Sequence, residues 1–167
     1  MGLRHLPSVA PVTAEPDHDA RLAELGLLLP GPYPPHDPLD AVVVHGGTAR
    51  TSGQLPRDHD GRITTGHLGH DLSVEQGAEA ARWCALNALS VLRAELGSLN
   101  RIERVLTVTG FVSSTPGFDQ QPAVVDGASR LLHDVFGDAG RHTRSAIGVA
   151  ALPRGGAVEI EVTVALR

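Results

Sequence analysis

The spacing of apolar positions along the chain predicts two long amphipathic helices. Apolar residues recur every three or four positions after Ser73, which forms a capping box with Gln76, and Gly97 ends the run. The same spacing returns after Pro122, a residue suited to the first turn of a helix, and ends at Gly137. Each helix therefore has one apolar face that can pack on a sheet.

Short β-branched runs predict strands around these helices. Runs at 41–45 and 48–52 flank a Gly-Gly pair, which is typical of a tight hairpin. A further strand is predicted at 105–112, between the two helices. Runs at 145–150 and 157–166 flank a Pro-Arg-Gly-Gly turn, and we expect them to form a second hairpin. The order hairpin, helix, strand, helix, hairpin predicts an α+β fold: a mixed β-sheet with the two main helices packed on one face.

Prolines and polar residues dominate the chain before this pattern begins. We expect residues 1–38 to form an N-terminal arm with a short helix at 21–25, because the prolines at 30–35 prevent regular structure there. Residues 39–167 are expected to form one domain. The total length of 167 residues fits a single domain of ordinary size.

Composition excludes several classes of chemistry. All 14 basic residues are arginine, so lysine Schiff-base catalysis, a pyridoxal-phosphate anchor and a Walker-type phosphate loop are ruled out. The net charge of −5 and an aromatic content of 3% argue against a nucleic-acid partner. A single cysteine, Cys84, fits a reducing cytoplasm, and no apolar run is long enough to cross a membrane. We expect a cytoplasmic protein without a metal or organic cofactor.

Two charged residues near the C-terminus are candidates for a site. Glu159 shares one face of its strand with Glu161, and it is either a solvated surface residue or a carboxylate that handles a water or proton. Arg144 precedes a nearly uncharged strand, and it either pairs with a surface acid or binds a substrate carboxylate. In the expected hairpin the two would lie about 20 Å apart, so a joint site would need a second copy of the chain.

Several short motifs occur in an order that resembles the YjgF/RidA family. They are Thr51-Ser52-Gly53-Gln54-Leu55-Pro56, Gly110-Phe111-Val112, and the stretch from Arg144-Ser145-Ala146-Ile147-Gly148-Val149 through Leu152-Pro153 to Val158-Glu159-Ile160-Glu161-Val162. Pro116-Gly117-Phe118 and Gly127-Ala128-Ser129 resemble, more narrowly, the branch labelled endoribonuclease L-PSP/chorismate-mutase-like. Together the motifs span most of residues 39–166.

The resemblance implies a chorismate-mutase-like fold, a homotrimer with clefts between subunits, and hydrolysis of reactive enamines and imines to 2-keto acids and ammonia. It implies that Arg144 holds the substrate carboxylate and Glu159 positions the attacking water, with a cleft lined by Ser52, Gly53, Phe111, Asp126 and Ala146. The chain departs from the family pattern by carrying Leu39 where a tyrosine is usual. Two alternatives stay open: a non-catalytic protein that binds small carboxylates, and an endoribonuclease, which the acidic charge balance disfavours.

Overall fold

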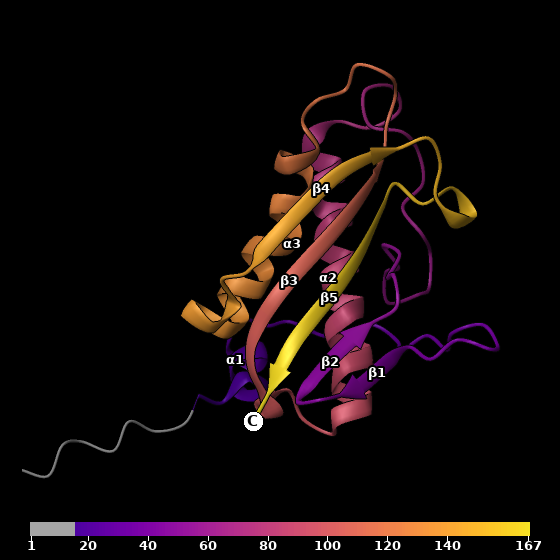
Figure 1. Cartoon of the computed structure of the whole chain (residues 1–167). Coiled ribbons are helices and arrows are strands. Elements are labelled where there is room, and N and C mark those ends of the chain that lie inside the picture. The colour runs from indigo at the N-terminus through magenta and orange to yellow at the C-terminus, as the bar shows by residue number, and fades with distance from the viewer. Residues whose placement is uncertain (1–15) are drawn as a thin grey trace, which may run out of the picture.

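A five-stranded mixed sheet with two long helices on one side forms the body of the protein. The computed structural model describes residues 16–167. In chain order its helices and strands are α1 (His18–Glu24), β1 (Val42–His45), β2 (Thr48–Thr51), α2 (Val74–Leu96), β3 (Ile102–Ser113), α3 (Gln121–Phe136), β4 (Thr143–Val149) and β5 (Val158–Leu166). Short 3-10 turns occupy Leu99–Arg101, Gly137–Gly140 and Pro153–Gly155. Figure 1 shows α2 and α3 behind the same face of the sheet.

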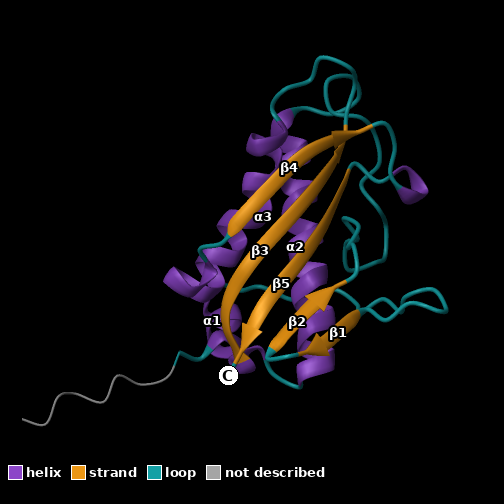
Figure 2. Ribbon diagram, in the orientation of Figure 1, coloured by secondary structure: helices purple, strands orange, loops and turns teal. Residues whose placement is uncertain are grey.

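The strand order is β1-β2-β5-β3-β4, with β3 and β4 parallel and the other pairs antiparallel (Figure 2). The predicted α+β class, the mixed sheet and the β1–β2 hairpin are therefore confirmed. The predicted hairpin of the last two strands is wrong, because β3 lies between β4 and β5. The segment that looked like a hairpin turn instead carries the chain across the end of β3.

The two predicted helices are present with the predicted ends. Ser73 and Gln76 form both hydrogen bonds of a capping box at the start of α2, and Gly97 ends it at a φ of 80°, which glycine adopts without strain. The helices approach each other closely at Gly127 of α3, where any side chain would overlap the backbone of Ala78 in α2. Small residues therefore fix the distance between the helices.

Alternating burial along β5 distinguishes the two faces of the sheet. Val158, Ile160 and Val162 are fully buried beneath the helices, whereas the residues between them are partly exposed. We call the side covered by α2 and α3 the helix face and the opposite side the open face. Within residues 16–167, no helix covers the open face, which is turned toward the viewer in Figures 1 and 2.

A short helix, α1, lies at His18–Glu24, where the sequence predicts one at 21–25, and it packs against the rest of the fold. Leu22 joins the hydrophobic core, and the side chain of Asn100 accepts hydrogen bonds from the backbone N–H groups of His18 and Asp19. The first part of the predicted arm, residues 1–15, lies outside the described residues, and the domain boundary at residue 39 stays a prediction. No helix in the described part of the chain is long and apolar enough to span a bilayer.

Candidate functional site

The register of the sheet divides the predicted site residues between its two faces. Arg144 is paired with Val108, and Val108 with the fully buried Val162, so Arg144 belongs to a row on the helix face. Glu159 is paired with Phe111, three positions further along β3 with no bulge between. Because side chains alternate along a strand, an odd offset places Arg144 and Glu159 on opposite faces.

The group on the helix face is built around Arg144, on the edge strand β4. One terminal nitrogen of its guanidinium donates to Asp126 Oδ1 at 2.8 Å and to Ser129 Oγ at 3.0 Å, and the other donates to the Pro122 carbonyl at 3.3 Å. All three acceptors belong to α3. The side chain is only 21% exposed, so the guanidinium is held against the helix rather than extended into solvent.

Asp126 partly neutralises this arginine. Its second carboxylate oxygen lies 3.7 Å from the guanidinium of Arg130, one turn later on α3. Two predicted site residues, Arg144 and Asp126, thus meet directly, and Ala146 lies beside them on the same face, packed against the core. A carboxylate that binds Arg144 would have to share its donors with Asp126.

The group on the open face is built around Glu159. Gly53, which follows β2, lies so close that a side chain there would overlap the Glu159 carboxylate. Burial raises the pKa of Glu159, and the nearby charge of Glu161 raises it further. Ser52 precedes Gly53 and donates its hydroxyl hydrogen to the Asp40 carbonyl, while Phe111 lies opposite Glu159 in the sheet.

The two glutamates of this face differ in their partners. Glu161 forms an ion pair with Arg50 at 2.8 Å. The Glu159 carboxylate has no hydrogen bond or ion pair within residues 16–167, although the residue is only partly exposed. A half-buried carboxylate without a partner is free to bind a water or a ligand.

The two groups are too far apart in one chain to hold a single small molecule. Arg144 and Glu159 are about 10 Å apart along the strands and about 10 Å across them, since they lie three residues and two strands apart. The predicted separation of about 20 Å rested on the hairpin that the structure lacks. The true obstacle is the sheet itself, which lies between the two side chains.

A cavity beside Arg144 is lined by two residues, Ser129 and His142, whose contact the sequence analysis did not predict. It has a volume of about 460 Å³ and is lined by Ser129, His142 and Arg144 together with further residues of α3 and the following turn. Ser129 Oγ lies 2.9 Å from His142 Nε2. The only signal in the sequence is the Gly-Ala-Ser motif at 127–129, since nothing links His142 to it before the fold is known.

Other candidates lie elsewhere. Leu39 is 59% exposed, and the Tyr33 hydroxyl donates to the backbone carbonyl of Asp58, apart from both groups. Cys84 is fully buried, and burial raises the pKa of its thiol. Within residues 16–167, no cluster of three or more His, Cys, Asp or Glu side chains is arranged to hold a metal ion.

Comparison with known proteins agrees with this fold. Residues 19–159 match the model of the family described as "YjgF/chorismate mutase-like, putative endoribonuclease". The chain therefore belongs to the YjgF family. It is 45% identical over 148 residues to protein TCP17 of Trypanosoma cruzi, covering 88% of this chain and 92% of that protein.

Two solved structures are similar over nearly the whole fold. The protein Atu1372 of Agrobacterium tumefaciens, whose function is given as unknown, is 39% identical with a TM-score of 0.82, covering 90% of this chain and 93% of that one. A protein of Shewanella oneidensis described as a "putative endoribonuclease" is 30% identical with a TM-score of 0.86, covering 90% of this chain and 99% of that one. The fold and family are thereby shown.

Proposed function

We propose that this protein hydrolyses small enamines and imines that carry a carboxylate, such as 2-aminoacrylate and its imine tautomer, to 2-keto acids and ammonia. The proposal rests on the surroundings of two residues, Arg144 and Glu159, that stand in the motifs resembling the family. Arg144 is fixed by three hydrogen bonds on an edge strand, and Glu159 is a half-buried carboxylate without a partner.

Arg144 would bind and orient the substrate. Its contacts with α3 leave the remaining guanidinium N–H groups for a ligand, and a carboxylate is the acceptor that a planar guanidinium fits best. Because the side chain is already held in place, little conformational entropy is lost when the ligand binds. The bound carboxylate would set the position of the adjacent imine carbon.

Glu159 would activate the water. Burial and the charge of Glu161 raise the pKa of its carboxyl group, which makes the carboxylate a stronger base toward a bound water. The water oxygen forms a bond to the imine carbon as its proton passes to Glu159. With the imine nitrogen protonated at the start, this gives a neutral carbinolamine, and Glu159 returns the proton to its nitrogen. The carbinolamine hydroxyl then gives its proton to Glu159 as the C=O bond forms and the C–N bond breaks, so the 2-keto acid and ammonia leave and Glu159 releases the proton to solvent.

The site would form between two copies of the chain. Arg144 lies at the outer edge of the sheet and Glu159 on its open face, so the open face of one copy would have to meet the β4 edge of another. Exposed apolar side chains, Ile147 on β4 and Val43 on β1, support self-association. A homotrimer, as the family resemblance implies, would place one such cleft at each of its interfaces.

The test is the release of keto acid from imines generated in situ. Wild-type protein is expected to accelerate the release, and Arg144→Ala or Glu159→Gln to reduce the acceleration by about 100-fold or more. Glu161→Gln is the matched control, because it removes a carboxylate of the same strand face that is engaged by Arg50. Glu161→Gln is expected to retain activity within about threefold.

Wild-type protein that binds pyruvate but leaves the rate of imine hydrolysis unchanged would overturn the enzymatic proposal. That result would establish the alternative, a protein that binds small carboxylates without turnover. Equal loss of activity in Glu159→Gln and Glu161→Gln would instead show that the charge of the open face, rather than the Glu159 carboxylate, is what matters.

A further inference from the structure

A serine and a histidine lie in hydrogen-bond contact in the cavity beside Arg144, on the helix-face side and away from Glu159. Ser129 Oγ is 2.9 Å from His142 Nε2, and His142 Nδ1 is 2.6 Å from the Gly140 carbonyl oxygen. A carbonyl oxygen only accepts hydrogen bonds, so Nδ1 carries the proton. In the neutral ring Nε2 is then an acceptor, and the Ser129 hydroxyl donates to it.

We propose that Ser129 and His142 form a nucleophile–base pair that hydrolyses small esters whose acyl group carries a carboxylate. The arrangement has the three parts of an activated serine: a nucleophile, a base in contact with it, and a third group that fixes the orientation and tautomer of the base. Here the third group is the Gly140 carbonyl.

The surroundings favour this role for the pair. Burial lowers the pKa of His142 more than the hydrogen bond to the Gly140 carbonyl raises it, and the charge of Arg144 lowers it further, so the neutral ring that can accept a proton is favoured. Arg144 also donates a hydrogen bond to Ser129 Oγ at 3.0 Å. The arginine stabilises negative charge on the serine oxygen as this oxygen loses its proton. It also stabilises the charge that then develops on the ester carbonyl oxygen beside it.

Close backbone approaches hold the pair in position. A side chain at Gly127, two residues before Ser129, would overlap the backbone of Ala78, and one at Gly140 would overlap the Leu132 carbonyl. The absence of a side chain at Gly127 therefore lets α3 pack closely on α2. The absence of one at Gly140 lets the turn after α3 fold back against the last residues of that helix. These two contacts bring His142 to Ser129, thirteen residues earlier in the chain.

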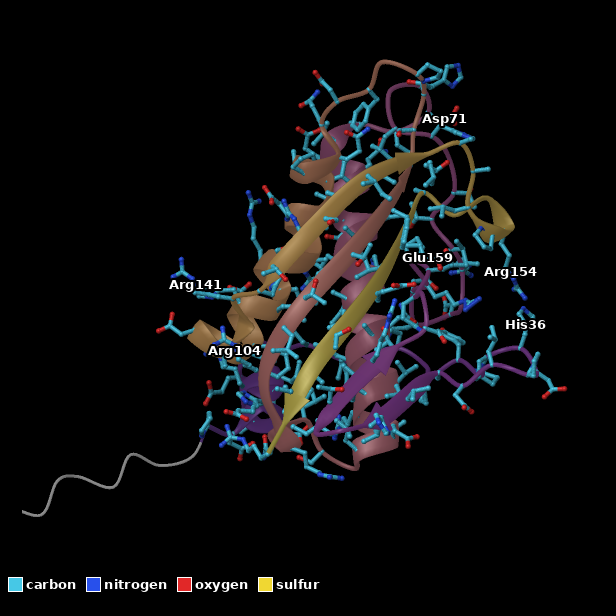
Figure 3. All side chains as sticks on the ribbon, in the orientation of Figure 1. His36, Asp71, Arg104, Arg141, Arg154 and Glu159 are labelled. Carbon is cyan, nitrogen blue, oxygen red and sulfur yellow. The ribbon has the colours of Figure 1, made fainter. Side chains whose placement is uncertain are left out.

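The shape and charge of the cavity define the substrate class. A volume of about 460 Å³ suits a small molecule. The lining contains three arginines, Arg130, Arg141 and Arg144, and one carboxylate, Asp134, while Asp126 beside the cavity pairs with Arg130 and Arg144, so three positive charges face two negative ones. Figure 3 shows Arg141 at this margin of the molecule, on the other side of β3 from Glu159. An acyl group with its own carboxylate matches this excess of positive charge.

The reaction needs no external reagent except water. Ser129 Oγ forms a bond to the ester carbonyl carbon, its proton moves to His142 Nε2, and the carbon–oxygen bond to the alcohol breaks as His142 protonates the leaving oxygen. A water then attacks the acyl-serine, its proton passes to His142 and on to Ser129 Oγ, and the free acid leaves. The chemistry is acyl transfer and involves no change in oxidation state.

The experiment compares two 4-nitrophenyl esters with equal acyl length, the monoester of glutarate and the ester of valerate. Wild-type protein is expected to prefer the charged glutarate ester by about tenfold in kcat/KM. Ser129→Ala and His142→Gln are expected to lower kcat by about 100-fold or more. Mass spectrometry should find the glutaryl adduct on Ser129.

Two further variants guard against misfolding and background reaction. Ser129→Cys keeps a nucleophile of nearly the same size and should still be acylated at residue 129, even if Ser129→Ala proves unstable. Ser145→Ala removes a serine on β4 outside the cavity and should leave turnover unchanged. An adduct absent from folded wild-type protein, or turnover unchanged in Ser129→Ala, would overturn the proposal and make the contact a structural tie. Both activities use Arg144, but imine hydrolysis also needs Glu159, whereas ester hydrolysis needs Ser129 and His142, so either activity can fail without the other.

Discussion

The polar groups on the two sides of the sheet differ in whether their side chains have hydrogen-bond partners. On the helix-face side, hydrogen bonds join Arg144 to Asp126 and Ser129, and Ser129 to His142. The His142 ring also bonds to the Gly140 carbonyl in the turn after α3. On the open face the Glu159 carboxylate is half-buried, has a raised pKa and bonds to nothing in the described chain. The polar groups on the helix-face side are therefore paired within a single copy, whereas the Glu159 carboxylate has no partner within residues 16–167.

Two glycines, one beside each group, differ in what an added side chain would meet. A side chain at Gly127 would meet the main chain of Ala78, which cannot move without separating α2 from α3. A side chain at Gly53 would meet the end of the Glu159 side chain, which can rotate away. A side chain at Gly127 is therefore expected to lower the stability of the fold, whereas a side chain at Gly53 is expected to lower activity and leave stability nearly unchanged.

The largest effect is expected from Gly127→Ala. Forcing the helices apart should lower the free energy of unfolding by about 2 kcal/mol or more, because overpacking against backbone outweighs the gain in helix propensity. Urea denaturation measures it as a fall in the midpoint. Unchanged stability would mean that the interhelical contact is loose and that α3 does not hold Ser129 rigidly.

A smaller effect, on activity rather than stability, is expected from Gly53→Ala. The new methyl group displaces the Glu159 carboxylate, so imine hydrolysis should fall by about tenfold or more while the free energy of unfolding changes by less than about 0.5 kcal/mol. Steady-state kinetics and urea denaturation of the same preparation give both quantities. A loss of stability equal to that of Gly127→Ala would remove the contrast between the two faces.

Asp126→Asn tests the helix-face group directly, because it removes the negative charge that pairs with Arg144. The dissociation constant for pyruvate is expected to fall by about three- to tenfold, because Asp126 no longer competes for the guanidinium. Isothermal titration calorimetry measures this constant, with Asp138→Asn as a control on the exposed turn after α3. Weaker binding in Asp126→Asn would show that the carboxylate positions Arg144 more than it competes with the ligand.

The smallest effect is a pH-dependent gain in stability from Glu159→Gln. A raised pKa in the folded state means that ionisation of Glu159 opposes folding as the pH rises above about 4.5. At pH 7 the glutamine variant should therefore be more stable than the wild type, and the gain should vanish below about pH 4, where the glutamate is protonated in both the folded and the unfolded state. Thermal melts at the two pH values test it. An equal gain at both would exclude ionisation as the cause.

The sequence allowed the local features of the fold to be predicted, because each depends on residues close together in the chain. The capping box at Ser73, the glycine at the end of α2 and the Gly-Gly turn between β1 and β2 are of this kind. The partners of β4 and β5 are not, since strand pairing depends on packing across the whole sheet. The turn-like Pro-Arg-Gly-Gly segment therefore predicts a hairpin that the structure does not contain, because β3 lies between β4 and β5.

The same limit applies to the site. Arg144, Asp126 and Glu159 could be chosen from motifs, and Arg144 does meet Asp126. Their division between two faces follows from the register with β3, which no local pattern encodes. The contact between Ser129 and His142 likewise requires the turn at Gly140 to fold back on α3. Such contacts become visible only in three dimensions.

The central claim, that Arg144 of one copy and Glu159 of another complete one site, is tested most directly by complementation. Arg144→Ala and Glu159→Gln chains with different tags are co-expressed, and oligomers that contain both are purified. Each variant alone should be inactive, and every purified trimer that contains both variants should have about one restored site in three, because only one of its three interfaces joins an intact Arg144 to an intact Glu159. Mixed oligomers that stay as inactive as either variant alone would contradict the claim.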